Sequence, residues 1–323
     1  MSESNYKNFN HLKIHSQYSI CEGAIKIDHL KDKAKEFKIK TLGLCDTSNL
    51  CGAIEFSDKL SKAGTQPIIG TQINFKFEET IGLLPLFALD EKGYKKIIEL
   101  SSKSYLDNHE LSDPHINIYD LIKLDNSGIS IFSGTVFGLF GKLFDKGKIS
   151  EITDLYKNLN KSFNNRFYLE IQRHNDINEK GFEKFNLNQS NNLKIPLIAT
   201  NEVFYLTKDM HEAHDALICI GNKTYINEKN RIKYSSEHYL KNDTEISKLF
   251  ADIPEALENN YNFPLRCNFR PLFSKPILPN ISSSEGGNAS DIIKKNSLYG
   301  LKEKFIKYFN IKLEEIENDK QFL

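Results

Sequence analysis

Histidine and lysine alternate near the start of the chain, in the stretch HLKIHSQYS from His11 to Ser19. If this stretch is a strand, His11, Lys13 and His15 lie on the same side, because side chains alternate across a strand. Two histidines spaced in this way are typical of a metal-binding platform, since imidazole nitrogens bind zinc. A lysine between them opposes metal binding because its charge repels a cation. The stretch therefore has the shape of a metal site with one residue of the wrong charge.

Three further polar stretches each follow a predicted strand. They are LCDTSN with Asp46, QRHN with His174 and TNEVFY with Glu202. Barrels of parallel strands build their sites at the carboxyl ends of the strands, so we expect these side chains to meet His15 at one rim. His15, Asp46 and His174 are ligand types that zinc or manganese accepts. Their spacing is not local, and on these residues alone buried histidines held by hydrogen bonds and a helix-capping Asp46 are the favoured interpretation.

Strand and helix patterns alternate over the first two thirds of the chain. Predicted strands include FNHLKIHS, TLGLCD, PIIGTQINF, GLLPLFAL, GISIFSG, RFYLEIQR and IPLIATNEV, and predicted helices lie between them. In IKIDHLKDKAKEFK, for example, Ile27, Leu30, Ala34 and Phe37 recur at helical spacing. The repeated βα pattern predicts an α/β fold with a parallel sheet, either a barrel or a doubly wound sheet.

The pattern changes after about Ser236. A helical stretch is followed by FRPLFSKPILPNISSSEGGNAS, which is rich in Pro, Ser and Gly and is typical of a linker. The last segment, which begins DIIKKNSLYGLKEKF, has an amphipathic helical pattern and stops abruptly. We therefore expect the chain to be a piece of a longer protein.

Composition narrows the class of protein. The chain has 323 residues and formal net charge zero, which argues against tight nucleic-acid binding by this stretch alone, because neutralising phosphates needs surplus positive charge. Its five cysteines are scattered without a C-x-x-C, as in reduced cytoplasmic proteins. The first residues lack the apolar core of a secretion signal, and no apolar run approaches the ~20 residues of a membrane span. We expect a cytoplasmic protein with no membrane partner.

Eight ordered motifs carry a resemblance to a known family. They are HLKIHSQYS…GAI, LCDTSNLCGAIEF, PIIGTQINF, EKGYKKIIELSS, FYLEIQRH, PLIATNEVFYL, EAHDALICI and LFADIPEALEN. Together they resemble the amino-terminal region of the alpha subunits of bacterial DNA polymerase III, which is a PHP (polymerase and histidinol phosphatase) domain. The resemblance implies a distorted TIM-like (β/α)7 barrel of the PHP type. It predicts a PHP domain over residues 1–275, a linker over 276–290 and an incomplete, helical start of the polymerase palm over 291–323.

The resemblance also implies which positions a metal-binding member uses, and several are altered here. The first histidine of the family's H-x-H is Lys13, and the histidine after the second strand is Thr47. The acidic residue of the PIIG-x-E stretch is Gln72, and the late D-x-H histidine is Phe204. A further family histidine falls near Leu83, where the sequence has none. These changes remove ligands or anionic charge and add a cation.

Four positions keep a ligand type. His15, Asp46 and His174 match the family, and Glu202 conservatively replaces the aspartate of D-x-H. We interpret the site as vestigial, with Lys13 replacing a metal's charge through an ion pair with Asp46 or Glu202. The alternative is that Lys13 extends outward and pairs with nothing. We expect no bound metal; any metal that does bind would use His15, Asp46 and His174.

Nucleotidyl transfer by two metal ions needs closely spaced carboxylates, and the chain contains no D-x-D. The resemblance places the catalytic aspartates beyond Leu323, so this piece alone is expected to be inactive, although the parent is a DNA-directed DNA polymerase that uses Mg²⁺. The implied partners are a proofreading exonuclease subunit, other replicative holoenzyme subunits, and DNA held by the palm, fingers and thumb. The alternatives are an active metal-dependent PHP phosphoesterase or 3′–5′ exonuclease, and, less favoured, a free-standing phosphatase.

Overall fold

The computed structural model describes residues 8–108, 113–276 and 288–309, and places nine strands of this part of the chain in one sheet. Eight strands follow one another in the order β8-β7-β6-β4-β3-β2-β1-β9, and β5 pairs with β3 away from this path. The strands are β1 His11–Ile14, β2 Thr41–Thr47, β3 Gln66–Phe77, β4 Thr80–Ala88, β5 Ile116–Asn117, β6 Ile129–Phe132, β7 Phe167–Ile171, β8 Leu197–Ala199 and β9 Glu202–Val203.

The two ends of this sheet come from neighbouring residues. β8 ends at Ala199 and β9 begins at Glu202, so only Thr200 and Asn201 separate the two edge strands along the chain. Strands at opposite ends of the order can be this close only if the sheet curls round on itself. The predicted distorted α/β barrel is therefore confirmed, with the predicted single strand IPLIATNEV divided into two short strands at its seam.

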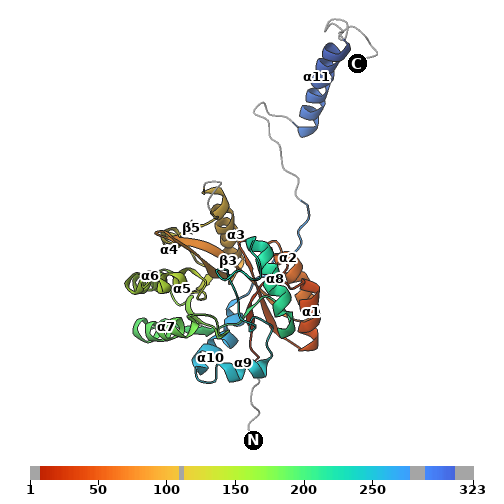
Figure 1. Ribbon diagram of the computed structural model, residues 1–323. Helices are drawn as coiled ribbons and strands as arrows, with labels where there is room; N and C mark the ends of the chain where they lie inside the picture. Colours follow the sequence, from red (N-terminus) through yellow and green to blue (C-terminus); the bar gives the residue numbers. More distant parts are fainter. Residues whose placement is uncertain (1–7, 109–112, 277–287, 310–323) are drawn as a thin grey trace. The chain divides into compact units, whose positions relative to one another are not determined.

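Helices surround the curled sheet in the first unit of the chain (Figure 1). They are α1 Ile27–Glu36, α2 Ala53–Lys62, α3 Glu91–Leu106, α4 Ile118–Lys123, α5 Leu139–Asp145, α6 Ile149–Phe163, α7 Glu179–Leu193, α8 His211–Asn222, α9 Asp243–Leu249 and α10 Pro254–Asn262, with 3₁₀ turns η1 Lys208–Met210 and η2 Phe263–Arg266. In α1, Ile27, Leu30 and Ala34 are buried, as their spacing predicts.

The sheet is parallel except at β4, which runs antiparallel to both β3 and β6. The expectation of an all-parallel sheet is therefore wrong at this strand. The reason is local, because only Glu78 and Glu79 separate β3 from β4. A two-residue connection can form a hairpin but cannot cross over to a parallel neighbour.

The interior of the barrel is divided into two layers. The apolar layer takes one buried side chain from each of seven strands and closes with Phe263 of η2; the strand residues are Leu12, Cys45, Ile68, Phe87, Phe132, Tyr168 and Ile198. Two residues further along β3 and β7 the same face carries Gly70 and Glu170, and Thr200 occupies the corresponding position directly after β8. The polar layer thus begins directly above the apolar one, toward the carboxyl ends of the parallel strands.

A second unit, Phe273–Leu323, contains α11 Ala289–Phe309. The expected helix is confirmed over these residues, but the expected amphipathic face is not, because the apolar residues of α11 are spread around its axis and none of its residues is buried. Most of the predicted linker and residues 310–323 lie outside the described residues. In the part of the chain that the structure describes, no helix combines the length and the apolar character needed to cross a membrane.

Candidate functional site

The polar layer of the barrel is centred on Lys13, whose side chain is completely buried. Its ammonium Nζ lies 2.9 Å from Glu202 Oε1 and 3.5 Å from Glu170 Oε1. The strand register places these residues together, since Lys13 on β1 is directly opposite Glu202 on β9. Lys13 therefore does not extend outward. Of the two partners that the sequence left open, it pairs with Glu202, and among the described residues it makes no ion pair with Asp46.

Each charge of the Lys13–Glu202 ion pair stabilises the charged form of the other residue. Burial opposes a charged Lys13, but the carboxylates of Glu170 and Glu202 outweigh it and raise the pKa of the ammonium. Burial likewise opposes a charged Glu202, yet the Lys13 charge and the hydrogen bond with His15 hold the pKa of that carboxyl well below its usual range. A buried pair of this kind is stable only while both partners are present. Lys13 and Glu202 are therefore both charged at neutral pH.

Glu170 is the second carboxyl beside Lys13, and sequence reasoning did not single it out. Its Oε1 accepts hydrogen bonds from Thr200 Oγ1 and, at 2.9 Å, from Gln172 Nε2, whereas its Oε2 is buried without a partner among the described residues. Burial raises the pKa of Glu170. The available signal was a glutamate within the apolar strand FYLEI, where an ionisable side chain needs a buried partner.

His15 and Gln72 complete the environment of Glu202. Both His15 Nε2 and Gln72 Nε2 lie 3.2 Å from Glu202 Oε1. A carboxylate only accepts hydrogen bonds, so His15 Nε2 carries a proton that it donates. Burial disfavours a second proton on the ring, but Glu202 and the nearby Glu22 more than compensate and raise the pKa of His15. The Glu202 carboxylate thus faces the ammonium of Lys13 and an N–H group from each of His15 and Gln72.

His11 does not join Lys13 and His15, although the alternating pattern predicts it. The pairing of β1 with β2 shifts register between His11 and Ile14, so the simple alternation fails within this short strand. The ring of His11 instead lies 2.9 Å, through Nε2, from the backbone carbonyl of Lys241. His11 therefore belongs to a different part of the molecule.

Asp46 and Thr47 organise the loop that follows β1. The Asp46 carboxylate accepts hydrogen bonds from Ser16 N at 2.6 Å and from the hydroxyls of Ser16 and Ser19, each at 2.8 Å. Thr47 donates its hydroxyl hydrogen bond to Glu22. With these donors in place, Asp46 anchors the loop at residues 16–19. The expected helix-capping role of Asp46 is wrong, because Asp46 lies within β2 and the N-cap of α2 is Gly52.

His174 contacts the backbone of Glu202. The backbone N–H of Glu202 points at His174 Nε2 over 3.2 Å, and the imidazole stacks on that of His238 with ring centres 4.0 Å apart and planes 7° apart. His238 Nε2 in turn lies 2.9 Å from Asp176 Oδ2. Burial keeps the pKa of His174 well below its usual value, so this ring is neutral.

The family model for the PHP domain matches residues 11–174 of this chain. The chain belongs to the PHP domain family. It is also 35% identical over 315 residues to the "DNA polymerase III subunit alpha" of Caulobacter vibrioides, covering 94% of this chain and 27% of that protein. The protein of the same description from Rickettsia bellii is 34% identical over 294 residues, covering 91% and 25%. The chain thus spans about a quarter of the length of these curated relatives.

A solved structure from Bacteroides vulgatus, described as a two-domain protein containing a predicted PHP-like metal-dependent phosphoesterase, is 12% identical with a TM-score of 0.34. The alignment covers 76% of this chain and 64% of that one.

The PHP positions of this chain do not fit a cluster of metal ions. Lys13 Nζ lies beside Glu202, the carboxylate that a cation would need, and Gln72 directs an amide N–H at the same oxygen. Asp46 already accepts three hydrogen bonds. A cation entering here would lie within a few ångströms of the Lys13 ammonium in a buried site, where like charges repel strongly.

A second group of possible ligands, His174, Asp176 and His238, has ligand atoms within 4.8 Å of one another. Sequence reasoning missed Asp176 and His238, and His238 follows His174 by a long stretch of chain with no motif that links them. The lone pairs of an imidazole lie in the ring plane, so two parallel stacked rings cannot direct both lone pairs at one ion. As arranged, the two rings stack on each other and His238 is hydrogen-bonded to Asp176.

Phe204 fills the place next to His15 where the metal-binding pattern has a histidine. Its ring centre lies 4.6 Å from that of His15, 4.9 Å from that of Tyr234 and 5.2 Å from those of His214 and His238. Phe204 is completely enclosed, with 1% of its surface exposed. An apolar ring therefore packs against His15, whose Nε2 lies 3.2 Å from Glu202 Oε1.

Proposed function

We propose that this PHP domain is a non-catalytic scaffold in the amino-terminal part of a replicative DNA polymerase of the DNA polymerase III alpha type. In this proposal the former metal centre is replaced by the ion pair between Lys13 and Glu202. The domain holds the palm region and a proofreading exonuclease subunit, and the polymerase itself acts on DNA with Mg²⁺ through parts outside this chain.

The observation that carries the proposal is the position of Lys13 Nζ, 2.9 Å from Glu202 and 3.5 Å from Glu170, with no exposed surface. A phosphoesterase of this class needs ions that activate water and hold phosphate oxygens. A lysine in their place neutralises the carboxylates but provides no Lewis acid and no bound hydroxide. The enclosed ring of Phe204, packed against His15, provides no ligand atom for a metal. The Lys13–Glu202 ion pair therefore stabilises the fold but does not supply what hydrolysis of a phosphate ester needs.

The likeness to two proteins named DNA polymerase III subunit alpha, each over more than nine tenths of this chain, supports the replicative context. Closely spaced aspartates encoded beyond Leu323 in the gene would agree with it. An open reading frame that lacks them would contradict the polymerase half of the proposal. The scaffold half is tested by copurification of the chain with the proofreading exonuclease subunit of the same organism.

The metal half of the proposal is tested by elemental analysis. The purified chain is dialysed against zinc and manganese and then against metal-free buffer, and is assayed on a phosphomonoester and on single-stranded DNA. We expect no stoichiometric metal and no hydrolysis. The comparison protein carries Lys13→His, Thr47→His, Gln72→Glu and Phe204→His together, which restores ligand types at the altered positions.

About one tightly held metal per unmodified chain, with nuclease activity that is lost on stripping, would support the alternative instead. That alternative is an active metal-dependent PHP phosphoesterase or 3′–5′ exonuclease using His15, Asp46, His174 and Glu202. Lys13→Met is the matched control, because it removes the opposing charge without adding a ligand. Metal uptake by the four-residue variant but not by Lys13→Met would show that ligands as well as charge were lost.

A further inference from the structure

The seam of the barrel separates β8, at one end of the sheet, from β1 and β9 at the other, and no strand pairing crosses it within the described part of the chain. On its other side β8 pairs with β7, and the backbone N–H of Leu169 donates to the carbonyl of Pro196. Backbone groups alternate in direction along a strand, so the carbonyls of Leu197 and Ala199 point toward the seam. Buried carbonyls on a free strand edge need hydrogen-bond donors from elsewhere.

Asn260 of α10 spans the seam with its side-chain amide. Its Nδ2 donates to the carbonyl of Ala199 at 3.0 Å and to that of Asn10 at 2.9 Å, and its Oδ1 accepts the backbone N–H of Asn10 at 2.8 Å. Asn10 Nδ2 in turn donates to the backbone carbonyl of Asn260 at 2.9 Å. Both side chains are buried. A side-chain amide carries the donor and acceptor types of a peptide group, so Asn260 takes the place of the strand hydrogen bonds that the seam lacks.

α10 also connects the seam to the apolar layer. Asn259 Nδ2 donates to the carbonyl of Leu197 at 2.7 Å, the second carbonyl on the free edge of β8. α10 continues without a break into η2, where Phe263 closes the apolar layer with its ring centre 5.2 Å from that of Phe132. Displacement of α10 from the seam would therefore also disturb the packing of Phe263.

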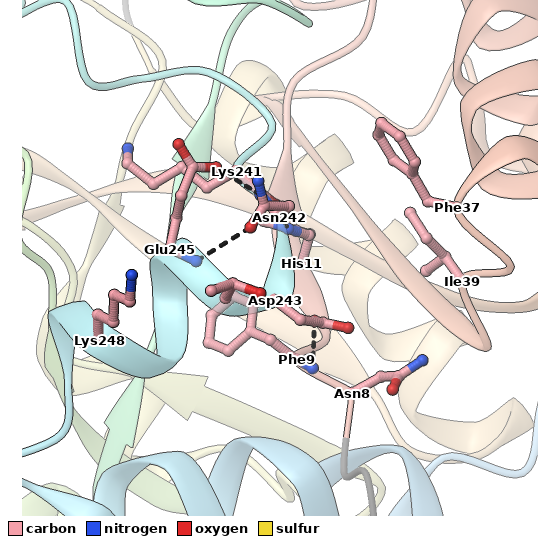
Figure 2. A pocket seen from close by; sticks show the side chains of 11 residues that line it. Asn8, Phe9, His11, Phe37, Ile39, Lys241, Asn242, Asp243, Glu245 and Lys248 are labelled. Atoms are coloured by element: carbon pink, nitrogen blue, oxygen red, sulfur yellow. Dashed lines mark hydrogen bonds between the residues drawn. The ribbon is translucent and has the colours of Figure 1, made fainter.

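The segment that leads into α9 holds one edge of the seam. Asp243 accepts the backbone N–H of Phe9 at 2.9 Å, and His11 Nε2 lies 2.9 Å from the carbonyl oxygen of Lys241 (Figure 2). These contacts fix the start of β1, but neither reaches β8. Asn260, by contrast, bonds to both edges at once.

We propose that the barrel opens locally at this seam and that Asn260 controls how often it opens. Without the Asn260 side chain, the carbonyl of Ala199 and both backbone groups of Asn10 would be buried without partners, which costs more than the net value of the bonds. Opening would also move Glu170, on the β8 side of the seam, away from Lys13 on the β1 side. The inference rests on the contacts of α10 and not on the proposed scaffold role, so either can fail without the other.

The first experiment is native-state hydrogen exchange of the unmodified chain, followed by mass spectrometry of its peptides. The amides of β8 and of the start of β1 are expected to exchange at least about tenfold faster than those of β3 and β4, since a local opening needs less free energy than global unfolding. Their rates should also rise less steeply with urea, because a local opening exposes less surface. Equal rates and equal urea dependence in the two regions would overturn the inference.

Variants identify the residue responsible. Asn260→Ala breaks three hydrogen bonds that are lost both in the open seam and in the unfolded chain, so exchange in β8 and in β3 should accelerate by the same factor, about 10- to 1,000-fold. Ile73→Val, at a buried position of β3, should accelerate exchange in β3 about two- to tenfold but leave β8 unchanged, because β3 stays folded when the seam opens. Equal acceleration of β8 and β3 by Ile73→Val would show that β8 exchanges only by global unfolding, and the inference would fail.

Asn262→Ala is the matched control, because Asn262 lies exposed on the same helix, and it should change neither rate. Asn259→Ala removes only one hydrogen bond and tests the inference if Asn260→Ala does not fold; we expect it to accelerate exchange in β8 about two- to tenfold. If neither Asn260→Ala nor Asn259→Ala accelerates exchange in β8, the role assigned to α10 is wrong.

Discussion

The two layers of the barrel interior are equally buried but are stabilised by different physics. In the apolar layer, residues such as Phe87, Phe132 and Phe263 pack with ring centres 4.7–5.6 Å apart. Their contribution is non-directional and grows with the area buried. In the polar layer, Lys13, Glu202 and Glu170 are stable only as a set, because each charge is buried at a cost that its partner offsets. The apolar layer should therefore lose stability gradually as side chains are made smaller. The polar layer should lose much of its stability when a single charged partner is removed.

The largest expected effect is that of removing one charge from the polar layer. Lys13→Met should lower the free energy of unfolding by about 3–5 kcal/mol, because it leaves the buried Glu202 carboxylate without its ammonium partner. Urea denaturation followed by far-ultraviolet circular dichroism measures this, since the chain has no tryptophan.

The control for this change is Lys13→Met combined with Glu202→Leu. The double variant should recover most of the loss, because burial raises the pKa of the remaining Glu170 and, without the Lys13 charge, favours its neutral form. If the double variant is as unstable as Lys13→Met alone, the two layers do not differ in the way described.

The next effect concerns pH. Burial lowers the pKa of His214 to about 4, whereas the ordinary value is 6.5. Between these values the unfolded chain binds a proton that the folded chain does not, so stability falls as pH falls from 6.5 to 4. The loss from this one group is about 3 kcal/mol.

The pH dependence is measured as the free energy of unfolding in urea at several pH values. His214→Gln should reduce the slope by about one proton, while His29→Gln, at an exposed histidine of α1, should leave it unchanged. A slope in His214→Gln that equals the unmodified one would show that His214 titrates normally in the folded protein.

A smaller effect is expected at the boundary of the two layers. Gly70 lies on β3 between Ile68 and Gln72, and a Cβ atom there would come within 2.5 Å of the Phe87 ring and 2.6 Å of the Leu86 carbonyl. Gly70→Ala should therefore cost about 1–3 kcal/mol through overpacking. Gly300→Ala in α11 has open space around it and should be neutral or slightly stabilising. Thermal unfolding of both variants measures the difference. Equal losses of stability in the two variants would argue against tight packing at this boundary.

The smallest effect is expected for an ion pair on the exposed surface of the barrel. Lys62 pairs with Asp58 at 2.7 Å on α2, but its side chain is 75% exposed. Lys62→Ala should change stability by no more than about 0.5 kcal/mol, because water and salt screen an exposed pair. A loss comparable to that of Lys13→Met would show that burial is not what makes the polar layer sensitive. The same urea titration provides the comparison.

The local elements of this protein were predictable from the sequence. The periodicity of α1 gives its buried face, and the alternation of strands and helices indicates the α/β barrel. The antiparallel direction of β4 was also available, because only about six residues separate the predicted strands PIIGTQINF and GLLPLFAL, too few for a crossover to a parallel neighbour. These features depend on neighbours within a few residues, which a single sequence displays directly.

The site was predictable only in part. His15, Asp46, His174 and Glu202 were expected at one rim because each follows a predicted strand, and Lys13 was expected as the residue of the wrong charge. The sequence left its partner open between Asp46 and Glu202, and it gave no reason to place Glu170, Asp176 or His238 nearby. It also placed His11 on the wrong side of the first strand.

The sequence alone determined which elements form and which strand ends carry polar side chains, because these depend on local periodicity and residue type. Only the tertiary structure decided which charges meet. Closure of the sheet brings β9 beside β1, and this places Glu202 opposite Lys13 across the seam of the barrel. The polar layer exists because that closure removes water from all of its charges at once, so each must find its partner among side chains that are distant in sequence.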